Sequence, residues 1–235
     1  MPTGRVFCTS FSPDGYERYG KRCLESFAEH CGDPIYVFYE GRKPDLKGPH
    51  YVDILEDLDL RDFLATYNTP AARGIIGLKD GHLVADYKWQ CVRFCYKVFS
   101  QRHFPKTDWW IWIDADTVLN KDLDKRFFDT VCPAKGLISY LGRKDWPHSE
   151  TGWIAYRVSH PVPRALISTL VSVYNTGDVF ALPEWHDAYV WDRAREKFHH
   201  WQDFFVNLSE GIGGTHVWPH TILGEYTEHF KGLNK

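Results

Sequence analysis

The sequence lacks the features of disulfide-rich, membrane-spanning and repetitive proteins. It has six cysteines in 235 residues and no Cys-x-x-Cys pair, so we expect reduced thiols rather than a disulfide framework. No apolar run is long enough to span a bilayer and no signal peptide is recognisable, which favours a soluble, cytoplasmic protein. Internal repeats, low-complexity tracts and long charged blocks are also missing.

An excess of charge of either sign is missing too. The chain has 28 Lys and Arg against 31 Asp and Glu, for a net charge of −3. This balance gives no general attraction to nucleic acids or anionic membranes, although a local patch is not excluded. What the chain does have is aromatic residues, which make up 16% of it and supply rings for packing and for stacking on ligands.

The hydrophobic pattern predicts an α/β protein. Residues 5–9 and 35–39 resemble strands and flank a helical pattern, and this opening predicts a parallel, right-handed strand–helix–strand unit. Further along, residues 58–67 are expected to form a helix and 69–81 a loop. Residues 84–100 are apolar almost all round, so we expect one long, largely buried helix there.

The most informative segment is the apolar run 109–113, which leads directly into Asp114 and Asp116. A short run this apolar predicts a strand buried on both faces, and backbone alternation would point the two aspartates the same way. At the carboxyl end of a central strand they would lie where open α/β sheets bind ligands. Two carboxylates suit Mg²⁺ or Mn²⁺, although a strand that simply ends in a turn explains the same residues.

Two further features carry charge into the predicted interior. Arg93 and Lys97 are four residues apart on one face of the expected buried helix, and either Asp114 or a substrate phosphate would balance them; an internal salt bridge is the alternative. Asp187 precedes a helix beside His186. It is therefore either a helix cap or an active-site carboxylate.

The order of these motifs resembles nucleotide-sugar glycosyltransferases of the GT-A fold, in particular the glycogenin-like and bacterial galactosyltransferase family. That family holds Mn²⁺ with an Asp-x-Asp pair and a histidine from a C-terminal His-x-x-Gly-x-x-Lys. The resemblance implies that Asp114, Asp116 and His229 are metal ligands and that Lys235 contacts the donor diphosphate. It also implies one GT-A domain over residues 1–235, with a donor half (1–120) and an acceptor half (121–235) that includes the metal-binding tail.

Weaker matches extend the resemblance. Thr9 and Tyr16 stand where the family contacts uracil, and Lys97 roughly matches a basic residue on the helix before the metal strand. Glu150 begins a Glu-Thr-Gly segment at the place of the family's Asn-x-Gly beside the sugar. Asp187 occupies the place of its acidic stretch near the reacting carbon. The resemblance therefore implies that Asp187 or Glu150 takes part in the chemistry.

Together these residues predict a metal-dependent enzyme that moves a hexose from a UDP-sugar to a hydroxyl acceptor. A glycan, a small molecule or a hydroxylated, flipped base in DNA would all serve as acceptor. A nucleotidyltransferase also uses paired carboxylates, but it more often has a Gly-rich phosphate loop, which is not found near the first strand. A non-catalytic sugar- or metal-binding module is the remaining alternative. The sugar, retention or inversion at the reacting carbon, and the oligomeric state stay open.

Overall fold

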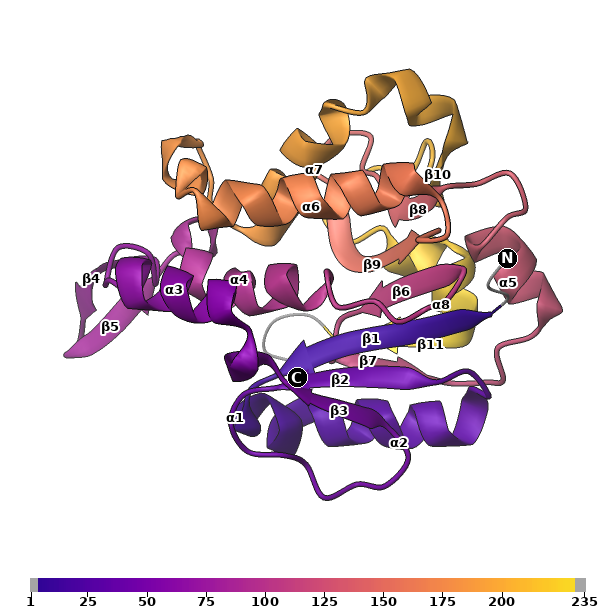
Figure 1. The fold of residues 1–235 in the computed structure, drawn as a ribbon, viewed down its shortest axis with the longest axis horizontal. Coiled ribbons are helices and arrows are strands. Elements are labelled where there is room, and N and C mark those ends of the chain that lie inside the picture. Colours follow the sequence, from indigo (N-terminus) through magenta and orange to yellow (C-terminus); the bar gives the residue numbers. More distant parts are fainter. Residues whose placement is uncertain (1–3, 231–235) are drawn as a thin grey trace.

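The structure, a computed structural model, describes residues 4–230. Its centre is a seven-stranded sheet in the order β10-β8-β9-β6-β1-β2-β3, with helices on both faces (Figure 1). Neighbouring strands are parallel except around β9, which runs antiparallel to both β6 and β8. This confirms the predicted α/β fold with a mixed, mostly parallel central sheet flanked by helices.

The strands and α-helices have the following residue ranges, in chain order. The strands are β1 (Arg5–Phe11), β2 (Ile35–Tyr39), β3 (His50–Asp53), β4 (Ile75–Lys79), β5 (His82–Ala85), β6 (Trp109–Ile113), β7 (Thr117–Leu119), β8 (Ile138–Leu141), β9 (Glu150–Tyr156), β10 (Phe205–Asn207) and β11 (Thr227–His229). The helices are α1 (Pro13–Gly15), α2 (Lys21–His30), α3 (Leu58–Tyr67), α4 (Cys91–Ser100), α5 (Lys125–Val131), α6 (Pro161–Asn175), α7 (Asp187–Glu196) and α8 (Ile222–Tyr226).

Strand β6 divides the core into two layers. Trp110 and Trp112 face the side covered by α3, α4, α6 and α7, where they join one hydrophobic cluster. Trp109, Ile111 and Ile113 face the other side, in the cluster of α2, α5 and α8. All five side chains are buried, because alternate residues of a strand point to opposite faces. The prediction of a strand buried on both faces is confirmed.

The segment between α3 and α4 differs from its prediction. The expected loop over 69–81 and long helix over 84–100 are replaced by a hairpin of β4 and β5, and α4 begins only at Cys91. The hairpin turns at Asp80 and Gly81, whose φ angles are 53° and 78°. Positive φ at both central residues of an Asp-Gly pair is the geometry of a tight two-residue hairpin turn. This local signal outweighs the helical pattern that begins at residue 84.

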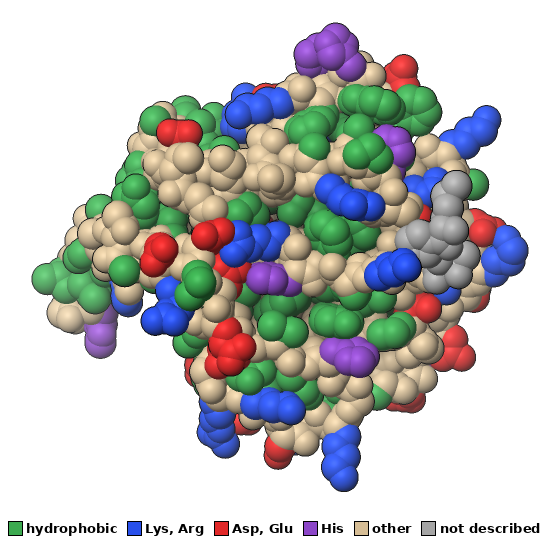
Figure 2. All heavy atoms as spheres, in the orientation of Figure 1, with side chains coloured by type: hydrophobic (Ala, Val, Ile, Leu, Met, Phe, Trp, Pro, Cys, Tyr) green, Lys and Arg blue, Asp and Glu red, His purple; other side chains and the backbone are tan. Residues whose placement is uncertain are grey.

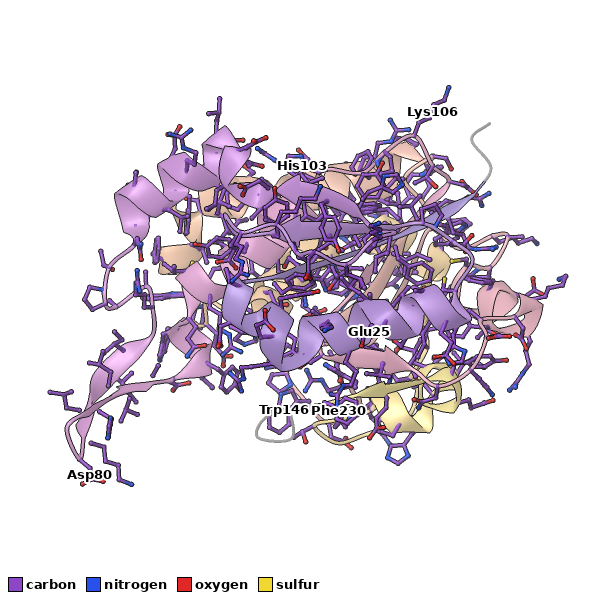
Figure 3. All side chains as sticks on the ribbon, turned by 90° about the horizontal axis from the view of Figure 1, so that it is seen from below. Glu25, Asp80, His103, Lys106, Trp146 and Phe230 are labelled. Atoms are coloured by element: carbon purple, nitrogen blue, oxygen red, sulfur yellow. The ribbon has the colours of Figure 1, made fainter. Side chains whose placement is uncertain are left out.

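The hairpin projects from the body of the molecule. Asp80 lies at its tip (Figure 3), and hydrophobic side chains gather on this end of the surface (Figure 2). Ile76, Leu78 and Leu83 are 62%, 71% and 67% exposed, so they take no part in the two core clusters. Within the described residues, no helix combines the length and apolar character that crossing a membrane requires. All six cysteines are free thiols, as expected.

Candidate active site

Three side chains of metal-ligand type meet at the carboxyl end of β6. Residues 114–116 form a turn, closed by a hydrogen bond from the Thr117 amide to the Asp114 carbonyl oxygen (3.1 Å). Strand β7 then pairs antiparallel with β11, which places His229 opposite Thr117. One ligand atom each of Asp114, Asp116 and His229 therefore lies within 4.8 Å of the others. A turn, rather than the predicted strand alternation, sets the direction of the two aspartates.

The three side chains are oriented by their neighbours. Asp114 Oδ1 accepts hydrogen bonds from Trp112 Nε1 and Lys97 Nζ, both at 2.8 Å, while its Oδ2 lies 4.0 Å from His229 Nε2. The same imidazole nitrogen is 3.1 Å from Asp116 Oδ1. Burial alone would lower the pKa of His229, but the nearby carboxylates of Asp116, Glu150 and Asp114 raise it. Two carboxylates and an imidazole around one point form a donor set that suits a divalent cation such as Mn²⁺.

Glu150 lies directly behind His229. Its carboxylate is 3.3 Å from His229 Nδ1, and it accepts hydrogen bonds from the Val217 amide (3.1 Å) and, with a protonated ring nitrogen, from His216 Nδ1 (3.0 Å). The side chain is 3% exposed. A carboxylate at the second nitrogen of an imidazole fixes the ring so that the first nitrogen is free to bind a metal. Gly152 leaves the necessary room, because a Cβ there would lie 2.9 Å from His229 Cε1.

Lys97 is the buried cation at the centre of the site. Its Nζ lies 2.8 Å from Asp114 Oδ1, 2.8 Å from Asp187 Oδ2 and 2.7 Å from the Thr151 carbonyl oxygen. Burial alone would lower the pKa of Lys97, but the charges of the two aspartates raise it, so it stays protonated. The counter-charge is therefore internal. Arg93, one turn earlier on α4, is exposed and donates to Gln90 Oε1 (3.0 Å).

Asp187 does not cap the helix that it begins. The N-cap of α7 is His186, whose Nδ1 accepts the Tyr189 amide at 3.4 Å, so the capping interpretation is wrong. The Asp187 carboxylate instead accepts the Thr151 hydroxyl (2.7 Å) and pairs with Lys97. Burial alone would raise its pKa, but the charges of Lys97 and His186 and the hydrogen bonds from Lys97 and Thr151 lower it to about 2. Asp187 is therefore a buried anion at neutral pH.

This depressed pKa predicts a loss of stability in acid. The pKa of Asp187 is about 2 in the folded protein against an ordinary 3.8, so its contribution is present above pH 4 and disappears as the pH falls towards 2. The shift corresponds to roughly 2 kcal/mol. Urea unfolding at a series of pH values should show wild-type stability falling more steeply below pH 4 than that of Asp187→Asn. Parallel pH curves for the two proteins would contradict the assignment.

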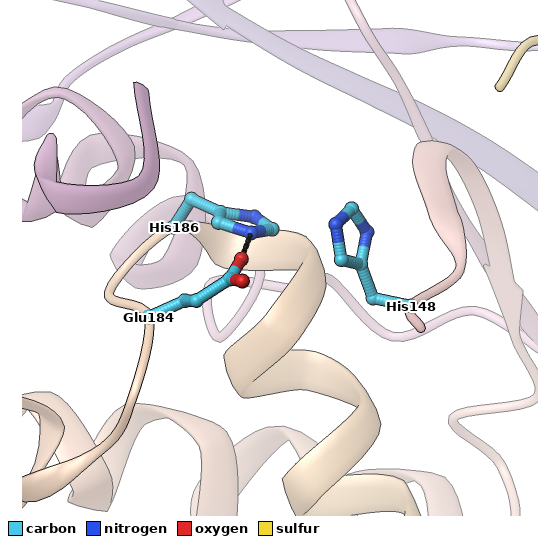
Figure 4. Close-up of side chains that lie close together, drawn as sticks. All are labelled: His148, Glu184 and His186. Carbon is cyan, nitrogen blue, oxygen red and sulfur yellow. Dashed lines mark hydrogen bonds and ion pairs between the residues drawn. The ribbon is translucent and has the colours of Figure 1, made fainter. Parts of the chain in front are cut away.

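His148, Glu184 and His186 form a second group of potential ligands (Figure 4). Its polar atoms already have partners. His186 Nε2 contacts Glu184 Oε2 at 2.8 Å, and the other Glu184 oxygen is 2.8 Å from Lys88 Nζ. His148 Nε2 accepts from Trp146 Nε1 at 3.2 Å. A cation would compete with the Lys88 ammonium, so this group is better suited to fixing the start of α7.

The candidate site opens into a cavity of about 590 Å³. Its wall holds the Asp114–Asp116–His229 group, the Lys97–Asp187 pair, Glu150 and Arg93, which were all identified from the sequence. The Glu-Thr-Gly segment also supplies Thr151 and Gly152 to the wall. Other residues of the wall were not identified from the sequence, chiefly Ser10, Tyr19, Tyr87, Arg143, Trp146 and His148. Of these, Tyr19 lies only three residues after Tyr16, the tyrosine that the resemblance had assigned to uracil, but on the turn Tyr16–Gly20 the two side chains line different hollows.

The two residues expected at uracil lie elsewhere. Thr9 on β1 is fully buried and does not line the cavity. Tyr16 lines a separate hollow of about 90 Å³; its hydroxyl donates to Asp45 Oδ1 (3.2 Å), and its ring lies 5.4 Å from that of Phe11. The structure therefore does not bring either residue to the metal-ligand group. Lys235, the expected diphosphate contact, lies outside the described residues.

Comparison with known proteins identifies the fold. No family model matches the sequence, and no curated protein matches it. Among solved structures, mouse xyloside xylosyltransferase 1 is similar over 88% of this chain and 86% of its own, with 11% identity and a TM-score of 0.51. The chain has a GT-A fold. The glycosyltransferase GlyE of Streptococcus pneumoniae is similar over 88% of this chain, with 12% identity and a TM-score of 0.50, and the match spans 46% of GlyE.

Proposed function

We propose that this chain is a metal-dependent glycosyltransferase that moves a sugar from a UDP-sugar to a hydroxyl acceptor. The observation that carries the proposal is the convergence of Asp114, Asp116 and His229 in the wall of a 590 Å³ cavity. This convergence occurs at the carboxyl end of the central strand of a GT-A fold. A nucleotidyltransferase would not need the late histidine beside the aspartates, and a non-catalytic binding module would not release a nucleoside diphosphate from a nucleotide sugar.

In this proposal the three side chains hold Mn²⁺ or Mg²⁺. The bound metal supplies positive charge where the nucleoside diphosphate leaves. Glu150 is then a positioning residue, because its carboxylate lies at His229 Nδ1 and keeps Nε2 directed at Asp116. This role replaces the direct chemical role that the sequence suggested for Glu150.

Lys97 and Asp187 are the proposed groups beside the transferred sugar. Lys97 ties Asp187 to the metal ligand Asp114, so the carboxylates keep a fixed spacing. A carboxylate with a pKa of about 2 is a weak proton acceptor. We therefore assign Asp187 to stabilising positive charge at the reacting carbon, or to nucleophilic attack there, rather than to deprotonating the acceptor.

The base of the donor is assigned to the end of β1. Ser10 and Tyr19 line the cavity there, and Arg93 faces the same space. We assign stacking on uracil to Tyr19, and a contact with the diphosphate to Arg93. Tyr16 lines the separate hollow of about 90 Å³, and Thr9 supports the strand from within the core.

The direct test is to incubate the protein with a panel of UDP-, GDP- and ADP-sugars and Mn²⁺, and to measure the free nucleoside diphosphate. We expect release from a UDP-sugar, no release in EDTA, and recovery when Mn²⁺ is restored. Calorimetry should also show UDP binding tighter than GDP or ADP. Equal affinity for the three diphosphates would contradict the base assignment, and full turnover in EDTA would contradict the metal role.

A further inference from the structure

A second hollow, of about 290 Å³, adjoins the 590 Å³ cavity, which we call the reaction cavity. Arg143, Trp146 and His148 line both spaces and form the wall between them. The hollow, which we call the basic groove, is lined by polar groups from the loop between β8 and β9, from α7 and from β10. Its charged lining residues are the cations Arg143, Lys144, Arg193 and Arg195 and the anions Asp192 and Glu196.

Both anions of the basic groove are already neutralised. Asp192 Oδ1 lies 2.9 Å from the Arg195 guanidinium, and the carboxylate also accepts the amide (2.5 Å) and hydroxyl (2.9 Å) of Ser149. Glu196 pairs with Arg193 one turn earlier on α7. Two of the four cations are therefore paired, and Arg143 and Lys144 carry the remaining charge.

Arg143 and Lys144 have no carboxylate partner within residues 4–230. Arg143 donates to two carbonyl oxygens, of Thr215 at 2.9 Å and of Ser149 at 2.7 Å, and its Nε is buried without an acceptor in this part of the chain. Burial lowers the pKa of this guanidinium, and the charges of Glu150 and Asp192 offset part of that effect. Within the described residues, Arg143 is half-buried and forms no direct ion pair, and it stands beside the exposed Lys144; such a pair of cations suits an oxyanion.

We propose that the basic groove binds an oxyanion, a phosphate or a carboxylate, carried by the acceptor substrate. The assignment of this oxyanion to the acceptor rests on the proposed function, whereas the oxyanion site itself is independent of it. Because Arg143 and Trp146 line both spaces, a molecule anchored at the groove reaches past the Trp146 ring into the reaction cavity. Asn207 adds a donor at the far wall, since its carbonyl oxygen is occupied by the amides of Gly142 and Ser209.

The donor end of the reaction cavity is rich in carboxylates rather than in cations. Asp114, Asp116 and Asp187 give it negative charge, and Lys97 is already paired with two of them. EDTA removes any metal from that end, where Arg93 is the remaining cation of the wall and forms no ion pair with another described residue. Anion binding in EDTA that is weakened by substitutions at Arg143 and Lys144 therefore reports on the basic groove.

The test is a calorimetric titration in EDTA with glucose 6-phosphate, glucuronic acid and glucose as probes. We expect the charged probes to bind, glucose not to bind, and added salt to weaken the binding. Lys144→Ala and Arg143→Gln should each weaken it roughly tenfold. The matched control is Lys106→Ala, which removes a lysine charge from the opposite side of the molecule (Figure 3) and should leave the affinity unchanged.

The outcomes separate the possible results. Preference for the sugar phosphate identifies a phosphorylated acceptor, and preference for glucuronic acid identifies a carboxylate. Absence of binding, or equal affinity in wild type and both groove variants, overturns the proposal. If the groove binds anions while Mn²⁺-dependent UDP binding is absent, the proposed function fails and the oxyanion site stands. If Mn²⁺-dependent UDP binding is present while the groove binds no anion, the proposed function stands and the oxyanion site fails.

Discussion

Replacing Asp116 with Asn is expected to lower the affinity for Mn²⁺ by about 100-fold or more and to remove metal-dependent turnover. The substitution keeps the size of the side chain but removes the charge, and Asp116 is the carboxylate nearest to His229 Nε2, at 3.1 Å. The fold should survive, because the 114–116 turn is held by backbone hydrogen bonds from Thr117 and Phe230. Calorimetric titration with Mn²⁺, and turnover at saturating Mn²⁺, measure the two effects.

A second substitution, at Glu150, distinguishes a metal ligand from a residue that positions a ligand. Glu150→Gln keeps an acceptor near His229 but loses the charge, so we expect a smaller loss of Mn²⁺ affinity, about 10- to 100-fold. Asp129→Asn is the matched control, because Asp129 is exposed and pairs with Lys125 on the same helix. Its Mn²⁺ affinity should equal that of the wild type. Unchanged affinity in Asp116→Asn would exclude the site, and a larger loss in Glu150→Gln than in Asp116→Asn would reverse the two roles.

Local patterns were sufficient to predict the framework of the sheet. The run of five apolar residues in β6 and the helix Leu58–Tyr67 were found from sequence alone, because burial on both faces and helical periodicity leave local traces. The Asp-x-Asp pair was likewise visible. The resemblance suggested His229, but its position depends on the pairing of β11 with β7. That pairing joins segments more than a hundred residues apart, and no local pattern specifies it.

Other features could not be predicted because they depend on packing in three dimensions. Lys97 was identified as a buried cation, but its simultaneous contacts with Asp114 and Asp187 require α4, the end of β6 and the start of α7 to meet. The two alternatives for Asp187 could not be separated for the same reason: His186 and Asp187 are both acceptable N-caps in sequence, and only the fold brings the Lys97 ammonium to the Asp187 carboxylate. Arg143 gave no signal in the sequence, because its contact with the Thr215 carbonyl oxygen joins loops that meet only in the folded chain.

Replacing Asp187 with Asn is expected to lower kcat by roughly 10²-fold or more while UDP affinity stays within about twofold of wild type. An asparagine at 187 still accepts the Thr151 hydroxyl, but it removes one of the two charges that balance Lys97. Losing a partner of a buried pair costs up to about 3–5 kcal/mol. We expect less here, because Lys97 keeps Asp114.

A loss of folding stability must therefore be separated from a loss of kcat. Asp57→Asn is the matched control, because Asp57 is also a buried carboxylate at a helix start; it accepts the Leu60 amide at 3.0 Å and pairs with Arg102 at 2.6 Å. Asp57 lies outside the reaction cavity, so Asp57→Asn should lose stability without losing kcat. If Asp187→Asn behaves like this control, Asp187 only holds Lys97 in place. A fall in kcat confined to Asp187→Asn, at temperatures where both variants are folded, places the carboxylate at the reacting carbon.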